Sequence, residues 1–410
     1  MHHKKLKTLF ISYDGLLDPL GKSQILPYIE SIVTHPRTVH VISFEKKKRL
    51  HDDKDNLRKK LSTRGINWTT LSFTNGLGLA GKIWDLMRMY FFGFLVAISE
   101  KSKIIHARGH AAAQVGLFLK RCLGLKLIFD FRGLWADERV DKGGWDLSKP
   151  FHRLQFSHFK KIEQKLLHHS DQIVVLTESV VDEVVRLGAQ SAGKITVIPC
   201  CADFDHFFLA DESAREAARI KSGNARDAFV LGYLGSVGSM YMTDRFFRLF
   251  ELVAAASPNV QVVAITPDME AFNVAMRKSL QPALHRFVHA HSASRDEVPK
   301  FLPAMDVLVS FIRPSYARLA SSPTKLAESL AAGIPVICNV GVGDLETLIV
   351  ELDAGIVVDA DSEDVLIVVA NNLTSLPAKG GVRLRDAARR KLGLEVAADR
   401  YLNVYRGLDA

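Results

Sequence analysis

The chain has 410 residues, and since a single hydrophobic core seldom grows past about 250 to 300 residues, this length predicts two domains. Hydrophobic residues make up 48% of the chain and charged residues 24%, a balance that excludes a largely disordered or fibrous protein. The formal net charge of +9 predicts an anionic partner, whether a membrane surface, a nucleic acid or a phosphate-bearing substrate.

The cysteines and the apolar stretches bear on the compartment. The four cysteines have neither C-x-x-C nor zinc-ligand spacing, which is typical of reduced thiols in a cytoplasmic protein. The apolar run at 8–13 is shorter than the core of a secretion signal. The run at 83–98 is shorter than the ~20 residues of a membrane-spanning helix and contains Asp85 and Arg88, so we expect a buried or amphipathic helix there.

In the first half of the chain, short β-rich apolar runs alternate with helix-length amphipathic stretches, which is typical of a parallel sheet covered by helices. The expected strands are 8–12, 39–44, 104–107, 126–131, 172–177 and 195–199. The expected helices include 23–33, 81–99, 112–123 and 179–187. This half is predicted to be a doubly wound α/β domain.

The second half repeats the alternation and predicts a second domain of the same class. Its expected strands are 230–235, 260–265, 307–311, 335–339 and 355–358. The segment 200–228 has no strand pattern and is predicted to hold the linker. We therefore place an N-terminal domain at 1–205, a C-terminal domain at 206–383, and a helical tail at 384–410 that folds back across the boundary.

The most informative motif of the second half is SSPTKLAESLAAGIPVI at 321–337. The hydroxyl of Ser322 is expected to cap a helix that begins at Pro323, because proline's fixed φ suits the first helical position. Gly333 is expected to end this helix, and Pro335 to open the next strand.

A helix N-terminus presents unpaired N–H groups and the positive end of the helix dipole, which together favour phosphate. Lys325 adds a positive charge in the first turn and could neutralise a leaving diphosphate. Glu328 lies on the same helical face, where its carboxylate could accept hydrogen bonds from ribose hydroxyls. The alternative is that Lys325 and Glu328 form an exposed ion pair on a surface helix.

Together with this motif, several other segments resemble the GT-B glycosyltransferases, in particular the retaining enzymes of family 4. They are GLLDPLGKSQ at 15–24, DFRGLWADE at 130–138, and the segments 176–179, 197–199 and 232–236. The resemblance implies two Rossmann-like doubly wound parallel-sheet domains facing a central cleft. It also implies metal-independent, retaining transfer of a hexosyl group from a nucleoside-diphosphate sugar, UDP- or GDP-linked, with no further cofactor.

The resemblance also implies an acceptor class, namely a glycan or a polyprenyl-linked glycan, in polysaccharide or cell-surface glycan synthesis. Two rival interpretations stay open. One is an inactive member of the fold that binds a nucleotide or a glycan, and the other is a sugar-nucleotide epimerase.

Carried onto this sequence, the resemblance assigns the donor site. Glu328 would bind the donor ribose, and Ser322, Thr324 and Lys325 would lie near the diphosphate. The remaining donor residues are the loop of Gly21 with Lys22 from the first domain, and Gly235 with Ser236 from the second.

The sequence departs from the family at three places. The stretch 236–244 lacks the arginine and lysine that clamp diphosphate in many members, so we expect Lys325, with Arg313 or Arg318, to supply the positive charge; the alternative is that both arginines are surface residues. Ala320 replaces the first of two glutamates, and Arg132 replaces a histidine.

Charged residues follow the strand that ends near residue 131, where ligands bind in doubly wound sheets. They are predicted to orient the acceptor hydroxyl and the reacting sugar; the alternative is an internal ion pair of Asp130 with Arg132 and a core role for Trp135. The predicted catalytic residues are Asp130, Arg132, Lys325 and Glu328, and the predicted acceptor residues are Asp14, His110, Arg132, Trp135, Asp137 and Glu138.

Two further signals concern metal and membrane. Asp359 and Asp361 resemble a D-x-D metal motif but are expected to form a solvated turn, so no metal is predicted.

The basic runs 46–49 and 58–60 are predicted to be a solvated face or a surface that docks on anionic lipid. No nucleic-acid motif accompanies the charge. We expect a cytoplasmic protein in peripheral contact with the inner face of the membrane.

Overall fold

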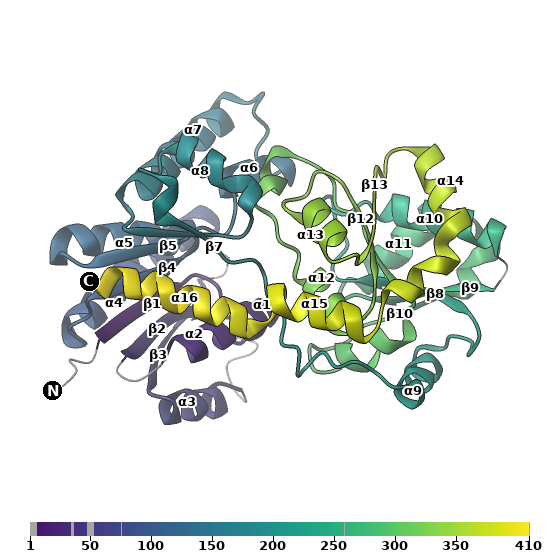
Figure 1. Ribbon diagram of the computed structural model, residues 1–410. Helices are drawn as coiled ribbons and strands as arrows, with labels where there is room; N and C mark the ends of the chain where they lie inside the picture. Colours follow the sequence, from purple (N-terminus) through teal and green to yellow (C-terminus); the bar gives the residue numbers. More distant parts are fainter. Residues whose placement is uncertain (1–5, 34–36, 47–52, 75, 258, 410) are drawn as a thin grey trace. The chain divides into compact units, whose positions relative to one another are not determined.

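The computed structural model describes residues 6–33, 37–46, 53–74, 76–257 and 259–409. The chain forms two compact units, one made of Met1–Pro199 with Leu394–Ala410 and the other of Cys200–Gly393. Each unit is a parallel sheet with helices on it (Figure 1). The predicted class, two doubly wound parallel-sheet α/β domains, is confirmed.

The first unit is built on a seven-stranded sheet with the order β3-β2-β1-β4-β5-β6-β7, and all of its strand pairs are parallel. The strand order reverses between β1 and β4. Six of its seven strands were predicted, with bounds that are correct to within a few residues, and β3 was not predicted. The strands are β1 (Leu6–Ser12), β2 (Arg37–Glu45), β3 (Ile66–Ser72), β4 (Ile104–Arg108), β5 (Lys126–Asp130), β6 (Gln172–Val175) and β7 (Ile195–Val197).

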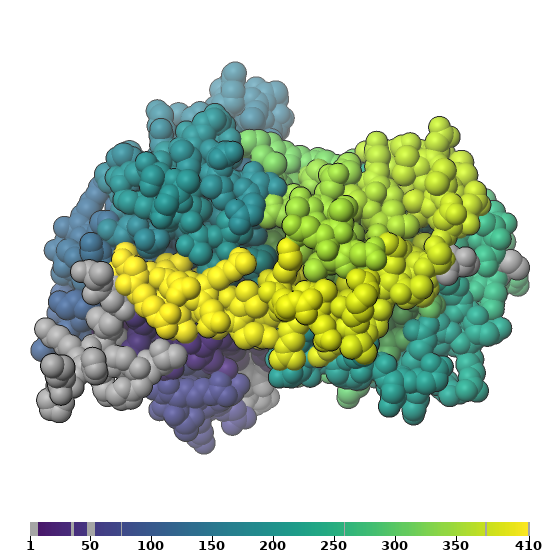
Figure 2. All heavy atoms as spheres, viewed as in Figure 1, coloured from purple at the N-terminus to yellow at the C-terminus, as the bar shows by residue number. Residues whose placement is uncertain are grey.

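The helices of the first unit bury one face each against this sheet or against a neighbouring helix. The C-terminal helix α16 packs on α2, where the rings of Tyr28 and Tyr401 lie 5.3 Å apart (Figures 1 and 2, yellow). The helices are α1 (Pro19–Gln24), α2 (Leu26–Ile32), α3 (Asp53–Thr63), α4 (Gly78–Ser99), α5 (Gly109–Leu123), α6 (Trp135–Asp141), α7 (Pro150–His169), α8 (Val181–Leu187) and α16 (Leu394–Asp409), with 3₁₀ turns η2 (Glu178–Val180) and η3 (Ala192–Lys194).

The second unit has a six-stranded parallel sheet with the order β10-β9-β8-β11-β12-β13. Its strand order reverses between β8 and β11, and alternate residues of β8 enter apolar clusters on opposite faces of the sheet. The predicted strands are confirmed within two residues, and β10 was not expected. The strands are β8 (Phe229–Leu234), β9 (Val260–Ile265), β10 (Val288–His291), β11 (Val307–Ser310), β12 (Val336–Asn339) and β13 (Gly355–Val358).

The helices of the second unit bury both faces of that sheet. Its α-helices are α9 (Glu212–Ser222), α10 (Thr243–Ala256), α11 (Met269–Ser279), α12 (Thr324–Ala331), α13 (Leu345–Glu351), α14 (Glu363–Asn372) and α15 (Val382–Leu392). Its 3₁₀ turns are η4 (Pro282–Phe287), η5 (Val298–Lys300), η6 (Leu302–Ala304), η7 (Tyr316–Ala320) and η8 (Leu373–Lys379).

The predicted linker at 200–228 is wrong, because this segment folds into the second unit. Phe204 and Phe207 are buried in its core. The segment also forms α9, whose Asp211 accepts a hydrogen bond from the Ala214 amide and whose end is set by Gly223 at a φ of +79°. A capped helix with two aromatic anchors is part of a domain.

The predicted tail at 384–410 is two helices with a break at Gly393 rather than one. Residues up to Gly393 belong to the second unit, while Leu394–Ala410 belong to the first. Two buried hydrogen-bonding tyrosines, Tyr401 and Tyr405, anchor α16 to the first unit.

The loop after β1 is closed by a backbone contact at Gly21, which lies inside α1 rather than in a loop as predicted. A Cβ atom at this position would come 2.0 Å from the carbonyl oxygen of Gly15 and 2.7 Å from the backbone of Leu16. Glu45 of β2 holds the same loop by accepting hydrogen bonds from the amides of Leu16 and Leu17, at 2.7 and 3.2 Å.

This contact predicts that Gly21→Ala destabilises the first unit by about 1 to 3 kcal/mol through overpacking. Helix propensity alone predicts the opposite sign, because alanine is favoured over glycine in a helix by about 1 kcal/mol. Urea unfolding followed by tryptophan fluorescence reports on this unit, since all four tryptophans lie within it. Gly193→Ala, at an open position, is the matched control. Equal unfolding free energies for the two variants would contradict the contact.

Candidate functional site

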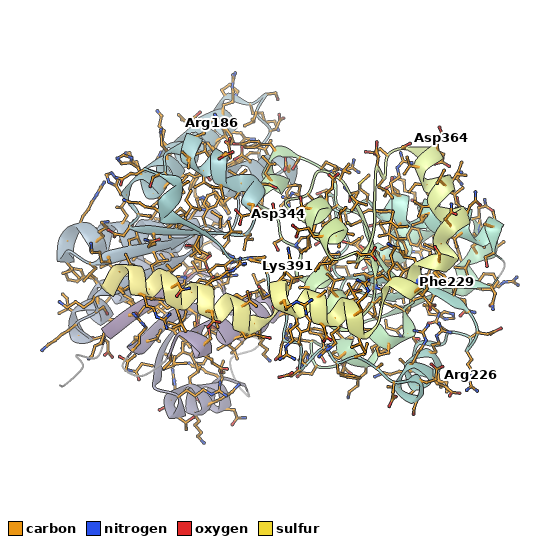
Figure 3. The ribbon with its side chains drawn as sticks, viewed as in Figure 1. Arg186, Arg226, Phe229, Asp344, Asp364 and Lys391 are labelled. Carbon is orange, nitrogen blue, oxygen red and sulfur yellow. The ribbon has the colours of Figure 1, made fainter. Side chains whose placement is uncertain are left out.

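The candidate site of the second unit lies where its strand order reverses, the position at which open α/β sheets bind ligands. Gly235 directly follows β8, whose first residue Phe229 is labelled in Figure 3. The loop after Gly235 pairs with the segment after β11 through two backbone hydrogen bonds. The Met242 amide donates to the Phe311 carbonyl, and the Arg313 amide donates to the Met240 carbonyl. The two loops at the reversal are therefore held together.

Helix α12 begins beside these loops, one residue later than predicted. Pro323 is its N-cap residue, and no side chain caps it. The Ser322 hydroxyl does not cap the helix as expected, because it accepts a hydrogen bond from the Cys200 amide at 3.1 Å. Gly333 follows the helix at a φ of +74°, as expected for its stop. The first amides of α12, beginning at Thr324, have no side-chain cap in the described part of the chain.

Lys325 is the central residue of this site. It is only 8% exposed, and its Nζ lies 4.2 Å from the ring centre of Tyr241 and 5.7 Å from that of Tyr233. A Cβ atom at Gly235, whose φ is +110°, would lie 3.4 Å from this Nζ. Among the residues that the structure describes, no side chain forms an ion pair or hydrogen bond with the ammonium.

Burial lowers the pKa of Lys325 from its ordinary value to about 8, although the carboxyl of Glu328 opposes the change. An ammonium taken out of water without a counter-ion loses favourable hydration, which the rings of Tyr241 and Tyr233 replace only in part. A bound anion would therefore stabilise the charged form of Lys325.

Glu328 is paired, but not with Lys325. Its Oε1 accepts a hydrogen bond from Arg295 at 3.3 Å, and the Arg295 guanidinium also lies 5.5 Å from the ring centre of Phe207. Burial raises the pKa of Glu328, and Arg295 partly offsets that shift. The alternative of an exposed Lys325–Glu328 surface pair is wrong, because the lysine is buried and the glutamate pairs elsewhere.

The two arginines proposed to replace the missing clamp differ in their surroundings. Arg318 is buried and donates a hydrogen bond to the Ser321 hydroxyl at 3.2 Å, so it is not a surface residue. Its positive charge partly offsets the rise that burial causes in the pKa of Tyr241. Arg313 is exposed, with its backbone in the paired loops. Ser236 is exposed, and its carbonyl accepts a hydrogen bond from the Tyr233 hydroxyl at 2.8 Å.

In the first unit, the predicted site residues Asp14 and Lys22 follow β1, which borders the point where the strand order of that sheet reverses. Asp14 follows β1, is exposed, and its amide donates to the Ser12 hydroxyl at 3.0 Å. Lys22 is exposed on α1.

Asp130, at the end of β5, is fully buried in a charged network. Its two carboxylate oxygens lie 3.1 Å from Arg108 and 3.3 Å from Arg132, and the Tyr401 hydroxyl donates to it at 3.4 Å. Burial alone would raise the pKa of Asp130, but Arg132, His106 and Arg108 hold it well below its ordinary value. The internal ion pair weighed above is thus present, and a role of these residues in catalysis stays a prediction.

His110 and Asp137 meet through two residues of α7. Nε2 of His110 lies 2.9 Å from Glu163, and Lys160 donates to Asp137 at 2.9 Å and to Glu163. Burial raises the pKa of Asp137, while Lys160 opposes the shift. This closed network joins α5, α6 and α7.

Trp135 and Glu138 lie on α6 beside this network. Trp135 is about one third exposed and packs edge-on against Phe159 and Trp145, so it is not a fully buried core residue. Glu138 pairs with Lys142 at 2.9 Å.

Sequence reasoning missed three of the charged or aromatic groups that define these sites. Arg295, Tyr241 and Arg108 come from separate segments, and the basic and aromatic residues there have no spacing that relates them to 325, 328 or 130. Arg108 could have been identified by its position, because it directly follows the predicted strand 104–107. In the structure it ends β4, beside the point where the strand order reverses.

The D-x-D segment forms a local turn, in which the Asp361 amide donates to the Asp359 carboxylate at 3.0 Å. Helix α14 follows, with Asp364 in its first turn (Figure 3). Of the basic runs, 47–52 lie outside the described residues, while Lys46 pairs with Asp18 and Lys60 with Glu30. Over the described ranges, the structure has no helix with the length and apolarity needed to cross a bilayer.

Comparison with known proteins finds one matching family model and several relatives. Residues 48–201 match the model of the glycosyl transferase 4-like domain. A D-inositol 3-phosphate glycosyltransferase of Thermomonospora curvata is 23% identical over 319 residues, which cover 74% of this chain and 71% of that protein.

Solved structures share the whole fold. Sucrose-phosphate synthase from Thermosynechococcus elongatus superposes with a TM-score of 0.71 at 15% identity, covering 98% of this chain and 99% of that one. HepE of Anabaena in complex with UDP-glucose superposes with a TM-score of 0.67 at 14% identity, again covering 98% and 99%. At these identities the likeness concerns the fold.

Proposed function

Given that this chain is a glycosyltransferase of the GT-B fold with a glycosyl transferase 4-like segment at 48–201, we propose that it transfers a hexosyl group from a nucleoside-diphosphate sugar to a glycan or polyprenyl-linked acceptor. The observation that carries the donor class is the buried ammonium of Lys325, which has no counter-ion among the described residues. A diphosphate would supply the missing negative charge.

The geometry around Lys325 fits a diphosphate better than an isolated carboxylate. Gly235 leaves the approach to Nζ free of a side chain, and the uncapped first turn of α12 offers backbone N–H groups at the same end. Arg318 and Arg313 belong to the neighbouring loop and add positive charge. Backbone amides and cations together stabilise the charge that develops on a leaving diphosphate.

Glu328 is proposed to bind the donor ribose, with Arg295 holding its carboxylate in place. The complex of HepE with UDP-glucose supports a uridine donor, and we propose UDP before GDP. Neither a metal nor a further cofactor enters the proposal. Transfer is proposed to retain the anomeric configuration, and the acceptor residues are those named around Asp130, His110 and Asp14.

We also propose that the protein works at the inner face of the membrane in polysaccharide or cell-surface glycan synthesis. A polyprenyl-linked acceptor resides in the bilayer, and the net charge of +9 suits an anionic surface.

The direct test is calorimetric titration with UDP, GDP and ADP, followed by product analysis with the corresponding sugar donors. We expect UDP to bind with the highest affinity and sugar to be transferred only in the presence of an acceptor. Conversion of the donor without an acceptor would indicate an epimerase.

An inactive nucleotide-binding member is the second candidate. The resemblance to family 4 implies a glutamate at the position of Ala320 and two cations within 236–244, and this sequence has neither. Binding without transfer or hydrolysis across the donor panel would favour it.

The affinity for UDP is expected to fall as the pH rises through about 8. The free Lys325 is protonated below that pH, and a bound diphosphate raises the pKa of Lys325, so binding above pH 8 requires uptake of a proton. The dissociation constant should therefore rise by up to about fivefold between pH 8 and 9. Calorimetry across this range measures it, and Lys325→Met should abolish the slope. A slope that persists in that variant would assign the titration to another group.

A further inference from the structure

His110 of the first unit forms a pair with a buried carboxylate. It stands at the start of α5, two residues after β4, which borders the point where the strand order of that sheet reverses. Ligands bind at this position in open α/β sheets. Its Nε2 lies 2.9 Å from Oε2 of Glu163, whose side chain is 1% exposed. The pair therefore links an imidazole at the ligand-binding edge of the sheet to an interior carboxylate.

This pairing decides which nitrogen of the imidazole carries the proton. An ionised carboxylate only accepts hydrogen bonds, so Nε2 donates to Glu163 and, in the neutral ring, the free lone pair is on Nδ1. Nδ1 has no hydrogen-bond partner among the described residues, and it is not one of their enclosed polar atoms that lack a partner. Nδ1 of His110 therefore reaches the surface, where its lone pair is open to a ligand.

Glu163 is itself held as an anion by a network that joins α5, α6 and α7 (Figure 1). Lys160 of α7 donates to Glu163, and it donates to Asp137 of α6 at 2.9 Å. Burial alone would raise the pKa of Glu163, but His110 and Lys160 more than offset that rise, so the pKa lies below its ordinary value. A carboxylate that stays ionised fixes the tautomer of the imidazole and stabilises the imidazolium when it forms.

Aromatic rings pack against the imidazole. The ring centres of Phe129 and Phe131 lie 5.4 and 5.3 Å from that of His110, and both phenylalanines are fully buried. The ring of Trp135 lies 6.2 Å away and is about one third exposed. The surface beside the imidazole thus includes an indole against which the apolar face of a sugar can pack.

We propose that His110 takes the proton of the acceptor hydroxyl, with Glu163 as its positioning residue. This rests on the proposed transfer to a glycan acceptor. The acceptor oxygen forms a bond to the anomeric carbon of the donor sugar, the bond from that carbon to the diphosphate oxygen breaks, and the hydroxyl proton moves to Nδ1 of His110. The diphosphate leaves with the electron pair of the broken bond, and the imidazolium later releases its proton to water. The configuration of the product depends on the side from which the acceptor approaches.

Initial rates of transfer by His110→Gln test the role of the imidazole. The glutamine amide can still donate to Glu163 but takes up no proton, so kcat at saturating donor should fall at least about 10²-fold. The affinity for UDP in calorimetry should be unchanged, because Lys325 belongs to the second unit. The matched control is His158→Gln, an exposed histidine of α7, which should react as the wild type does.

The pH profile separates proton transfer from a structural role. The wild-type kcat should fall toward acid pH in the range where imidazole takes up a proton, because imidazolium accepts no second one. His110→Gln should lose this acid limb. Glu163→Gln should lower kcat about tenfold and shift the limb to lower pH, because the negative charge that favours imidazolium is gone. A structural role would lower the rates and leave the shape of the profile as it is.

Diethyl pyrocarbonate gives a second measurement on the wild type if either variant fails to fold, since it modifies accessible unprotonated imidazole nitrogens. Peptide mapping by mass spectrometry should find His110 modified at the rate at which transfer activity is lost, while UDP binding persists. An unmodified His110, or a kcat of His110→Gln within a few-fold of wild type, would overturn this inference and leave the proposed transfer standing. Absence of transfer by the wild type across the donor panel would overturn the proposed function and this inference together.

Discussion

Lys325→Met is expected to lower kcat/KM for sugar transfer by about 10²- to 10³-fold, the usual effect of removing one group that stabilises developing negative charge. Methionine has a similar length and remains compatible with the rings of Tyr233 and Tyr241. The substitution therefore removes the charge while largely preserving the packing. Initial rates with the UDP-sugar found in the titration measure the effect.

The thermal midpoint separates a binding role from a structural one. Replacing a buried charge that has no counter-ion by an apolar side chain is neutral or stabilising, so the midpoint should stay the same or rise. Lys278→Met, an exposed lysine of the same unit, controls for the loss of a positive charge. Activity of Lys325→Met within a few-fold of wild type, with intact folding, would refute the donor site.

Lys325 and Glu328 of the candidate donor site differ in how much of their surroundings the sequence could predict. Lys325 was identifiable because it lies in the first turn of a short helix between two strands, a purely local pattern. The partner of Glu328 was not, since Arg295 is 33 residues away in the chain and reaches the carboxylate only through the fold. Local motifs predict which groups are present, whereas their pairing depends on tertiary structure.

The strands follow the same division. Central strands such as β8 and β11, with the sequences FVLGYL and VLVS, are almost wholly buried and are almost entirely apolar, so they were predicted. The two missed strands are edge strands with polar positions: β3 has the sequence INWTTLS and β10 has VHAH. An edge strand has a neighbouring strand on one side only and can keep polar, partly exposed residues. Its sequence then lacks the apolar run by which a strand is predicted.

The mistaken linker has a related cause. The segment 200–228 contains many charged and small residues, and α9 is amphipathic with a strongly polar outer face. Its attachment to the second unit depends on Phe204 and Phe207, two isolated aromatics with no periodic pattern. Sparse anchors of this kind can hold a segment in a core without marking it as an element in the sequence.

Asp130→Ala is expected to destabilise the first unit by about 3 to 5 kcal/mol, because it removes one partner of a buried ion pair and leaves the other uncompensated. Arg108 is as buried as Asp130, and its Nε has no hydrogen-bond partner among the described residues, so the carboxylate is its principal compensation. The Tyr401 hydroxyl would lose its acceptor as well, which weakens the attachment of α16.

Asp130→Asn separates the charge from the hydrogen bonds, since the amide keeps an oxygen acceptor without its negative charge. Its cost should lie between those of Asp130→Ala and the exposed control Asp182→Ala, which should stay below about 1 kcal/mol. Urea unfolding monitored by tryptophan fluorescence measures all three, because the four tryptophans and this network belong to the same unit. A loss below about 1 kcal/mol for Asp130→Ala would show that the network is dispensable for stability. Since the readout is unfolding rather than turnover, that result would leave catalysis as the reason for burying a carboxylate between two arginines at the end of β5.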